Sequence, residues 1–376
     1  MAIRRNSIMN STDFLVLIGT KAQFIKTAPI LCEMDRQHVP YRLIYTGQHS
    51  ETFDLLEAAF GTRPADDELV PNTEASTHAS FLAWTVKFWK QVFRRLPQWR
   101  GSPGGLVHGD TASTLFTAIA LRMAGVPVVH VEAGLRSQKL MEPFPEEIIR
   151  RCVSRLARLH LAPDASSTAN LAKAPGIVVN TRGNTLRDAL TLALKNWPDL
   201  PESGGLGGYA VVSMHRSENL GRKADFDLLM GEVLNTAAVL PTRFVLHPAT
   251  RERIRETGWL AKLQAQPGLR LLDRMDYPDF VRLLIGSCCL LTDGGSNQEE
   301  AAMLGLPTLL LRRATERLDG LGESIELSHL KPELIQAFVY RNAGKTWKLR
   351  PVEGASPSTI IVNSLREQLG RPADNR

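Results

Sequence analysis

Short apolar, β-rich runs alternate with segments of helical spacing along most of this 376-residue chain, and no other feature constrains its fold as strongly. In the first half these runs lie at 14–19, 41–47, 106–110 and 126–134. In the second half they lie at 209–215, 243–248, 269–272, 288–295 and 307–312. Strands that alternate with helices are typical of parallel βαβ units. We therefore predict an α/β fold with two Rossmann-like, doubly wound parallel sheets.

A Pro- and Gly-rich segment at 196–208 separates the two series and reads as a linker. It divides the chain into an N-terminal domain at 14–195, a C-terminal domain at 209–345 and a tail at 346–376 with one helix near 357–369. A length above that of one hydrophobic core agrees with two domains. Two such sheets imply a cleft between the domains, and their ligands bind beyond the carboxyl ends of the strands.

Composition narrows the classes of function. No run approaches the ~20 apolar residues of a membrane span, and the N-terminal residues lack the apolar core of a signal peptide, so we expect a cytoplasmic protein. The net charge of +6 suits an anionic ligand. The basic residues are scattered and not interleaved with aromatics, which argues against nucleic acid. The His and acidic residues lack metal-ligand spacing and no GxGxxG is present, so neither a metal nor a cofactor is expected.

Candidate site residues follow the strands of the first half. A turn at Gly19 leads into a helix that carries Lys21 and Lys26. Free N–H groups at such a helix start bind anions, although an ordinary βα turn explains the pattern equally well. Asp110 follows a later strand, where helix capping is the alternative. Glu132 ends an apolar strand, where burial raises the pKa of a carboxyl group and suits it to proton transfer.

A helix predicted at 143–158 carries two further candidates, Glu146 and Arg150. Acids in a first helical turn interact favourably with the helix dipole, and residues four apart form salt bridges, so a purely structural Glu146–Arg150 pair is the alternative.

The second half offers candidates for an anion site. His215 follows the strand at 209–215 and either grips a phosphate or belongs to a polar loop. Gly294, Gly295 and Ser296 open a helix after a buried strand, an arrangement in which backbone amides cradle a diphosphate. Glu300 is placed to accept ribose hydroxyls. Arg312 follows the last core strand, with a surface charge run as the alternative.

Nine motifs occur along the chain in one order: GTKAQFIKTAP (19–29), TGQH (46–49), HGDTAST (108–114), HVEAGLRS (130–137), PFPEEIIRR (143–151), GNTLRDAL (183–190), MHRSENLG (214–221), TDGGSNQEE (292–300) and RRATER (312–317). From about residue 14 to about 325 the chain resembles the bacterial UDP-N-acetylglucosamine 2-epimerase family, whose two-domain fold is the GT-B type. The resemblance implies an isomerase that interconverts UDP-N-acetylglucosamine (UDP-GlcNAc) and UDP-N-acetylmannosamine, or a derivative, for surface polysaccharide biosynthesis. The family eliminates UDP to give a 2-acetamidoglucal and adds UDP back with a proton on the opposite face.

The resemblance also implies roles for individual residues. Asp110, Glu132 and Glu146 are similar to the family's sugar-site acids, and His215 to its leaving-group stabiliser. Binding of the substrate and its UDP is implied for Lys21, Lys26, Arg150, Gly294, Gly295, Ser296, Glu300 and Arg312. The partner is then a UDP-sugar, and a homodimer is expected because relatives are often dimers.

The departures from the family pattern leave other outcomes open. The usual GTRPE has Lys21 and Gln23 here, the usual HRRE has Ser217, and the hydroxyl of the phosphate turn is shifted to Ser296. The segment 50–52 lacks the basic residue and methionine found where many non-hydrolysing members hold an allosteric substrate molecule. The alternatives are a hydrolysing epimerase that releases N-acetylmannosamine and UDP, a GT-B glycosyltransferase, and a non-catalytic nucleotide-sugar binder.

Overall fold

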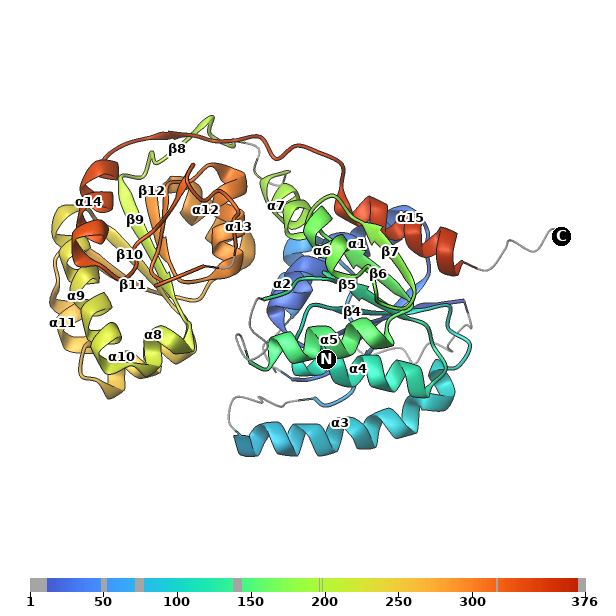
Figure 1. Cartoon of the computed structure of the whole chain (residues 1–376). Coiled ribbons are helices and arrows are strands. Elements are labelled where there is room, and N and C mark those ends of the chain that lie inside the picture. The colour runs from blue at the N-terminus through green and yellow to red at the C-terminus, as the bar shows by residue number, and fades with distance from the viewer. Residues whose placement is uncertain are drawn as a thin grey trace. The chain divides into compact units, whose positions relative to one another are not determined.

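The computed structural model describes residues 12–48, 53–71, 78–137, 144–195, 197, 199–315 and 317–370. The chain divides into two compact units (Figure 1). Unit 1 comprises Met1–Leu192 together with Gly354–Arg376, and unit 2 comprises Ala193–Glu353. In the described parts of the chain, no helix combines the length and the apolar character needed to cross a bilayer.

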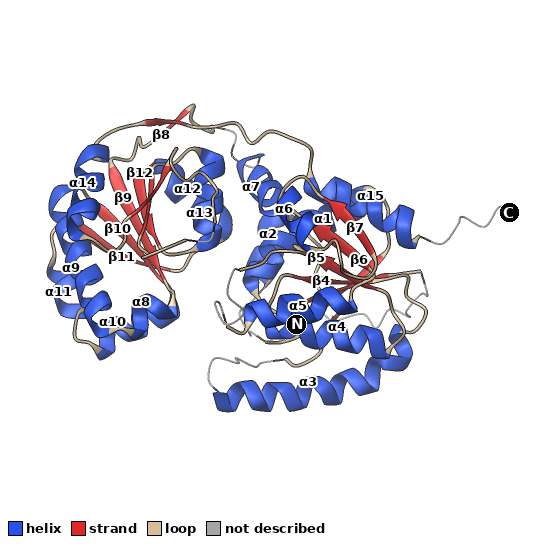
Figure 2. Ribbon diagram, in the orientation of Figure 1, coloured by secondary structure: helices blue, strands red, loops and turns tan. Residues whose placement is uncertain are grey.

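Unit 1 is built on a seven-stranded parallel sheet in the order β3-β2-β1-β4-β5-β6-β7. Its strands are β1 (Phe14–Ile18), β2 (Tyr41–Tyr45), β3 (Asp67–Glu68), β4 (Gly105–His108), β5 (Val128–Val131), β6 (Leu159–Ala162) and β7 (Ile177–Asn180). Its helices are α1 (Lys21–Arg36), α2 (Asp54–Phe60), α3 (His78–Trp99), α4 (Ala112–Met123), α5 (Glu146–Leu156), α6 (Ala165–Asn170), α7 (Leu186–Lys195, whose last turn enters unit 2) and α15 (Pro357–Leu369). In one group of helices α1 contacts α2 and α15, and in another α4 contacts α3 and α5 (Figure 2).

Unit 2 contains a six-stranded parallel sheet in the order β11-β10-β9-β12-β13-β14. Its strands are β9 (Tyr209–Met214), β10 (Thr242–Leu246), β11 (Leu269–Asp273), β12 (Ser287–Thr292), β13 (Thr308–Leu310) and β14 (Ile325–Leu327), and β8 (Ser203–Gly204) pairs antiparallel with β15 (Trp347–Lys348). Its helices are α8 (Ser217–Gly221), α9 (Lys223–Val239), α10 (Pro248–Glu256), α11 (Leu260–Ala265), α12 (Tyr277–Gly286), α13 (Gly295–Leu304) and α14 (Pro332–Asn342).

The order of strands reverses at one point in each sheet. β1 pairs with both β2 and β4, and β9 pairs with both β10 and β12. Every residue of β1 and β12 is buried, as expected for parallel strands that are covered on both faces. Ligands of doubly wound sheets bind beyond the carboxyl ends of the strands at such reversals, so the loops after β1, β4, β9 and β12 are the ones to examine.

The predicted fold class, two doubly wound parallel sheets, is confirmed. The sequence did not predict β3, β6, β7 or β14, and the segment expected to be a plain linker contains β8. Residues 346–353 belong to unit 2, whereas α15 packs against α1 of unit 1. The first part of the predicted tail therefore belongs to unit 2 and its helix belongs to unit 1.

Candidate active site

The turn from β1 into α1 is closed by the side chain of Gln23. Its Oε1 accepts the backbone N–H groups of Gly19 and Thr20, at 2.8 and 3.1 Å. Its Nε2 donates to the carbonyl oxygen of His108 at 2.8 Å and to the hydroxyls of Thr111 and Thr114. Gln23 is 5% exposed, so this side chain ties the start of α1 to the loop after β4. The glutamine that departs from the family pattern thus has a structural role here.

Glu132 follows β5, and its carboxylate receives two strong donors. Lys26 Nζ, from α1, and Asn184 Nδ2, from the loop before α7, each lie 2.6 Å from Oε1. The other oxygen, Oε2, lies 3.7 Å from Nδ1 of His108, which is too far for a hydrogen bond. Burial lowers the pKa of His108 to about 4, so the ring is neutral at neutral pH. The groups that face Glu132 therefore include a cation, Lys26, and a neutral imidazole, His108.

Asp110, in the loop after β4, forms an ion pair with Arg150 of α5. Arg150 Nε and Nη2 lie 2.7 and 2.6 Å from Oδ2 of Asp110. The cap of α4 is Thr111, so the alternative in which Asp110 caps that helix is wrong. Arg150 also lies 3.7 Å from the fully buried Glu147, and not in the expected Glu146–Arg150 pair.

Glu147 holds the start of α5 together. Its oxygens accept the backbone N–H of Ser137 at 3.0 Å and Nε of Arg151 at 2.8 Å. Glu146, the neighbouring candidate, lies in the first turn of α5 and is partly exposed, but its Oε2 is buried and has no hydrogen-bond partner among the described residues. A buried carboxylate oxygen of this kind is suited to an incoming hydroxyl or to a proton.

In unit 2 the loop after β9 is fastened to the end of β12 by Asp293, which is 0% exposed. Its oxygens accept the backbone N–H groups of His215 and Arg216, at 2.9 and 3.0 Å, and Nδ2 of Asn219 at 2.9 Å. The ring of His215 is tilted by 32° relative to that of His247, which follows β10, and the two ring centroids lie 5.2 Å apart. Desolvation lowers the pKa of His215, and the carboxylate of Asp293 opposes this shift. The side chain of His215 remains 42% exposed.

Gly294 caps α13, and Gly295 and Ser296 form its first turn. A Cβ atom at Gly294 would lie 3.1 Å from Cε1 of His215, and one at Gly295 would lie 3.1 Å from Nε of Arg317. These glycines therefore allow a histidine and an arginine to approach the N-terminus of the helix. Arg317 is itself held by Glu299 at 3.0 Å. Cations beside a helix N-terminus provide the charge that a diphosphate requires.

Glu300 and Arg312 lie deeper than the turn, with 3% and 6% of their surface exposed. Burial raises the pKa of Tyr277, and the nearby carboxylate of Glu300 raises that pKa further. Nη1 of Arg312 lies 3.5 Å from the hydroxyl of Thr315. A buried arginine at this position contradicts the alternative of a surface charge run.

The candidates form two groups, one in each unit. Unit 1 brings Lys26, Glu132, Asp110 and Arg150 to the carboxyl ends of β4 and β5, with Lys21 in the first turn of α1. Unit 2 brings His215 to the turn at Gly294 and Gly295. Three residues of the family motifs, His49, Pro143 and Glu316, lie outside the described residues, as does the segment 50–52. Across the described residues, no three His, Cys, Asp or Glu side chains gather as the ligands of a metal would.

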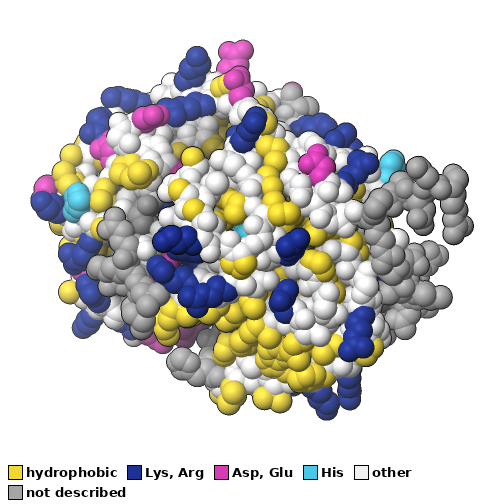
Figure 3. Space-filling model, turned by 45° about the vertical axis from the view of Figure 1, so that its right-hand side comes forward, with side chains coloured by type: hydrophobic (Ala, Val, Ile, Leu, Met, Phe, Trp, Pro, Cys, Tyr) yellow, Lys and Arg dark blue, Asp and Glu magenta, His cyan; other side chains and the backbone are white. Residues whose placement is uncertain are grey.

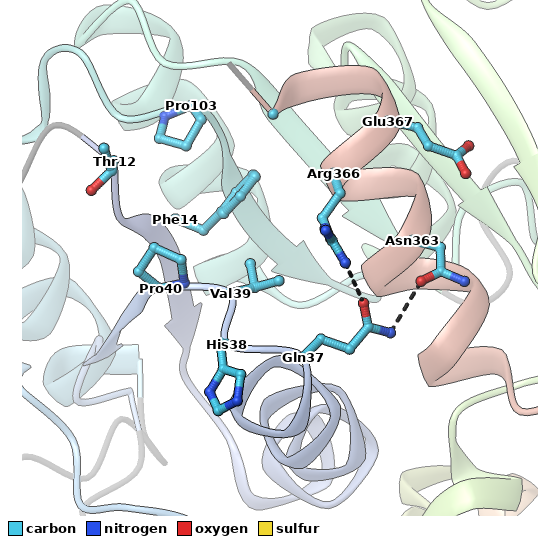
Figure 4. Close-up of a pocket in the computed structure, with 11 residues that line it drawn as sticks. Thr12, Phe14, Gln37, His38, Val39, Pro40, Pro103, Asn363, Arg366 and Glu367 are labelled. Atoms are coloured by element: carbon cyan, nitrogen blue, oxygen red, sulfur yellow. Dashed lines mark hydrogen bonds between the residues drawn. The ribbon is translucent and has the colours of Figure 1, made fainter. Parts of the chain in front are cut away.

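A pocket of about 660 Å³ lies at the opposite edge of the unit 1 sheet, at the amino-terminal ends of β1 and β2 and against α15 (Figure 4). Gln37 bonds to Asn363 and Arg366 across its wall. None of the candidate site residues lines it. The strand-end clusters, and not this pocket, therefore carry the candidate chemistry.

Comparison with known proteins decides the family. A family model described as UDP-N-acetylglucosamine 2-epimerase matches residues 33–343. This chain belongs to the UDP-N-acetylglucosamine 2-epimerase family. A Ralstonia solanacearum protein named "Probable UDP-N-acetylglucosamine 2-epimerase" is 34% identical over 81% of this chain and 83% of its own length. The Bacillus subtilis UDP-N-acetylglucosamine 2-epimerase is 30% identical over 83% and 82% of the two chains.

Solved structures of UDP-N-acetylglucosamine 2-epimerases share the fold. The enzyme from Neisseria meningitidis bound to UDP-GlcNAc has a TM-score of 0.76 and 26% identity, and the match covers 95% of this chain and 100% of that one. The Methanocaldococcus jannaschii enzyme in complex with UDP-GlcNAc and UDP has a TM-score of 0.80 and 24% identity, over 94% and 99% of the chains. The family is one of isomerases, and the comparisons do not favour the glycosyltransferase alternative.

Reasoning from the sequence of this epimerase-family chain missed several residues of the clusters. Asn184 lies 52 residues from Glu132 in the chain, and only the fold brings the two together. The GNTLRDAL motif contained the signal, because asparagine before a helical segment suggests a cap with a side chain near the strand ends. Glu147, Asp293 and Arg317 were part of recognised motifs, but their partners depend on tertiary contacts.

Proposed function

We propose that the chain interconverts UDP-GlcNAc and UDP-N-acetylmannosamine by elimination and re-addition of UDP. The observation that carries the proposal is the carboxylate of Glu132, held by Lys26 and Asn184 next to the Asp110–Arg150 pair. Moving a hydrogen on and off a sugar C2 carbon requires positioned carboxylates, and unit 1 supplies them at neighbouring strand ends. Family membership and the names of the relatives support the same reaction.

The chemistry follows from these groups. A carboxylate takes the proton from C2, the C2–H electron pair forms the C1=C2 bond, and the C1–O bond breaks so that UDP leaves with its electron pair. UDP oxygen then adds back to C1 while C2 takes a proton from an acid on the opposite face. Asp110, Glu132 and Glu146 are our candidates for the base and the acid. The N-terminus of α13, with Gly294, Gly295 and Ser296, is the proposed diphosphate site.

The other assignments complete the proposal. His215 stabilises the departing phosphate, and Arg317 adds a cation beside the same helix turn. Glu300 accepts ribose hydroxyls, and Arg312 supports the turn. Lys21, Lys26 and Arg150 balance the charges of phosphates and carboxylates. In this scheme the reaction runs on side chains and needs no added cofactor.

Incubation with UDP-GlcNAc in deuterated water tests the function, with C2 followed by NMR. Deuterium at C2 together with UDP-N-acetylmannosamine is the expected result. Free N-acetylmannosamine and UDP would instead indicate the hydrolysing reaction. No deuterium at C2 and no product, with this and related UDP-sugars, would contradict the proposal.

We propose further that unit 1 pairs with a second copy of the chain through the outer face of α3 and α4. Leu82, Val86 and Phe93 of α3 are 66%, 63% and 58% exposed and lie on one stripe of the helix, and Met123 of α4 is 46% exposed. Figure 3 shows a broad apolar area in the lower part of the molecule, where α3 lies, bordered by Lys and Arg side chains. An apolar area of this breadth indicates an interaction surface.

The dimensions of this face suit a homodimer. The 22 residues of α3 span about 33 Å and the 12 of α4 about 18 Å, so helices of ~10 Å width give on the order of 500 Å², within a factor of two of the ~800 Å² that each partner contributes to a stable interface. α3 contains no acidic residue. Its exposed Lys87 and Lys90 border the apolar stripe, whose centre is apolar as in interface cores.

Sedimentation of Val86→Glu tests the pairing. We expect the natural chain to be a dimer and the variant a monomer with an unchanged circular dichroism spectrum. Leu55→Glu, an exposed leucine on α2, is the matched control and should remain dimeric. A monomeric natural chain, or one that instead floats with anionic lipid vesicles, would contradict the proposal.

A further inference from the structure

Asn184 reaches Glu132 from the loop between β7 and α7. Its Nδ2 lies 2.6 Å from Oε1, the same oxygen that receives Nζ of Lys26 at 2.6 Å. Both donors are short, as is typical of hydrogen bonds to an ionised acceptor. One oxygen of the carboxylate is therefore bound from two different elements of the fold.

The orientation of the Asn184 amide is set by a second bond. Its Oδ1 accepts the backbone N–H of Leu186 at 3.0 Å, at the first residue of α7. An amide has an acceptor on one side and donors on the other, so this bond turns the NH₂ group toward Glu132. The start of α7 thus determines which group the carboxylate meets.

The backbone of Glu132 makes this support necessary. Glu132 has φ of 62°, in the left-handed region, which is strained for a residue other than glycine. Donors on Oε1 hold the side chain of this strained residue in one direction. A Cβ atom at Gly109 would meet Oε2 at 3.7 Å, an ordinary van der Waals contact, so Oε2 faces the loop after β4.

Groups from several elements of unit 1 face the Glu132 carboxylate. Lys26 approaches from α1, Asn184 from the loop before α7, and His108 from β4. Asp110, paired with Arg150, follows His108 by two residues. Lys26 is charged and Asn184 is neutral, so replacing Asn184 by another neutral residue leaves the charge around the site unaltered.

We infer that Asn184 is a positioning residue, which with Lys26 saturates Oε1 and keeps Glu132 ionised, so that proton exchange with the sugar C2 occurs at Oε2. The reaction part of this inference rests on the proposed function. The electrostatic part does not, because it concerns the ionisation of Glu132 in the protein without substrate.

Two substitutions separate the hydrogen bond that Asn184 donates to Glu132 from the one that it accepts at the start of α7. Asn184→Ser keeps an acceptor for the N–H of Leu186, since serine is a good N-cap, but is too short to reach Glu132. Asn184→Asp keeps the same acceptor and turns a second carboxylate toward Oε1. Both variants should fold, and in both the ionised form of Glu132 should lose support, more so in Asn184→Asp.

The first readout is the ¹³C titration of the Glu132 carboxyl, assigned by its absence in Glu132→Gln. We expect its midpoint to rise by about one pH unit or more in Asn184→Ser, and further in Asn184→Asp. The second is the pH profile of deuterium exchange at C2, whose acidic limb should move upward with the carboxyl. At pH values below the midpoint, an upward shift of one pH unit lowers the exchange rate about tenfold. At high pH, where Glu132 is ionised, we expect the exchange rate of Asn184→Ser to come closer to that of the natural chain than the rate of Asn184→Asp does.

Asp164→Ala is the matched control. Asp164 caps α6 through the N–H of Ser167 at 2.7 Å, so its removal weakens a helix start of unit 1 elsewhere. It should lower the melting temperature and leave both midpoints unchanged. Midpoints in the two Asn184 variants equal to that of the natural chain would overturn the inference. Absence of C2 exchange in the natural chain would contradict the proposed function alone. The titration of the Glu132 carboxyl would still test the role of Asn184.

Discussion

Asp293 and His215 are joined across two loops of unit 2. The backbone N–H of His215 donates to Oδ1 of Asp293 at 2.9 Å, and Nδ1 of the ring lies 3.7 Å from the same oxygen. Because Asp293 is fully buried at the end of β12, this contact fixes a half-exposed histidine relative to the first turn of α13. The proposed leaving-group residue thus depends on a carboxylate that no solvent reaches.

Asp293→Asn tests this dependence. The carboxylate raises the pKa of His215 against desolvation, so the neutral amide should let that pKa fall further. The amide NH₂ also faces buried donors, and we expect a loss of about 1–3 kcal/mol in unfolding free energy. ¹⁵N NMR titration of His215 and thermal unfolding measure the two effects. Asp279→Asn, at an exposed position of the same unit, should change neither, and an unaltered His215 titration in Asp293→Asn would contradict the coupling.

Glu132→Gln should abolish most of the C2 exchange. Glutamine retains an oxygen for Lys26 but cannot take up a proton, so we expect the exchange rate to fall by roughly 10²–10⁴-fold. UDP affinity, measured by calorimetry, should stay nearly unchanged because UDP is assigned to unit 2. Glu326→Gln, which breaks an exposed pair with Arg341, is the control. Exchange that survives in Glu132→Gln would show that another acid serves C2.

Gln23→Glu restores the family's usual residue and should destabilise this chain. An ionised glutamate has no hydrogen to donate to the carbonyl oxygen of His108, which Gln23 Nε2 contacts at 2.8 Å. Burial beside that oxygen would raise the pKa of the new carboxyl in the folded state. The variant should therefore approach the natural chain in stability at low pH and lose about 1–3 kcal/mol as pH rises through that pKa. Melting curves between pH 5 and 8 measure the difference in stability between the variant and the natural chain. A difference that shrinks or stays constant as pH rises would contradict this prediction.

Three buried histidines on adjacent strands make unit 1 sensitive to acid. Burial lowers the pKa of His108 to about 4, that of His130 to about 3, and that of His160 in the same direction. In the unfolded chain these groups take up protons below about pH 6.5. The unfolding free energy should thus be fully present above that pH and fall as pH drops toward the folded values, by up to ~1.4 kcal/mol per histidine per pH unit.

His160→Gln tests this pH dependence. Nε2 of His160 lies 2.7 Å from the carbonyl oxygen of Pro175, and a glutamine amide can donate there without titrating. The slope of melting temperature against pH between 7 and 5 should be smaller in this variant. His38→Gln, at an exposed position, should keep the natural slope. Equal slopes in all three proteins would contradict the assignment.

The strands that the sequence predicted include the two that are buried throughout. These are Phe14–Ile18 and Ser287–Thr292, and the segments that follow them carried half of the candidate residues. β6 was missed because Leu159–Ala162 is only four residues long and follows directly on the helix predicted at 143–158. Its buried His160 bonds to the carbonyl oxygen of Pro175. β7 was missed because Ile177–Asn180 is short and only half-buried.

In the candidate site, the sequence predicted the positions of some residues but not their side-chain partners. Glu132 and Asp110 were recognisable because they end or follow strands, where the chain direction alone predicts their place. Their partners were not: a pair of Arg150 with Glu146, four residues away, was the structural alternative, and Arg150 instead reaches Asp110 from another element. Side-chain partners follow from how helices pack on the sheet, which local sequence patterns do not specify.

The return of α15 to unit 1 has a consequence for biosynthesis. Unit 2 is an insertion within unit 1, since α15 follows it in the chain and packs against α1. Domains generally begin to fold as they leave the ribosome, N-terminal parts first. Here every strand of the first sheet is synthesised before unit 2, yet the helix that covers α1 emerges only afterwards. The unit that is begun first is therefore completed last, and a nascent chain that stops before residue 354 contains a complete second unit and a first unit that still lacks α15.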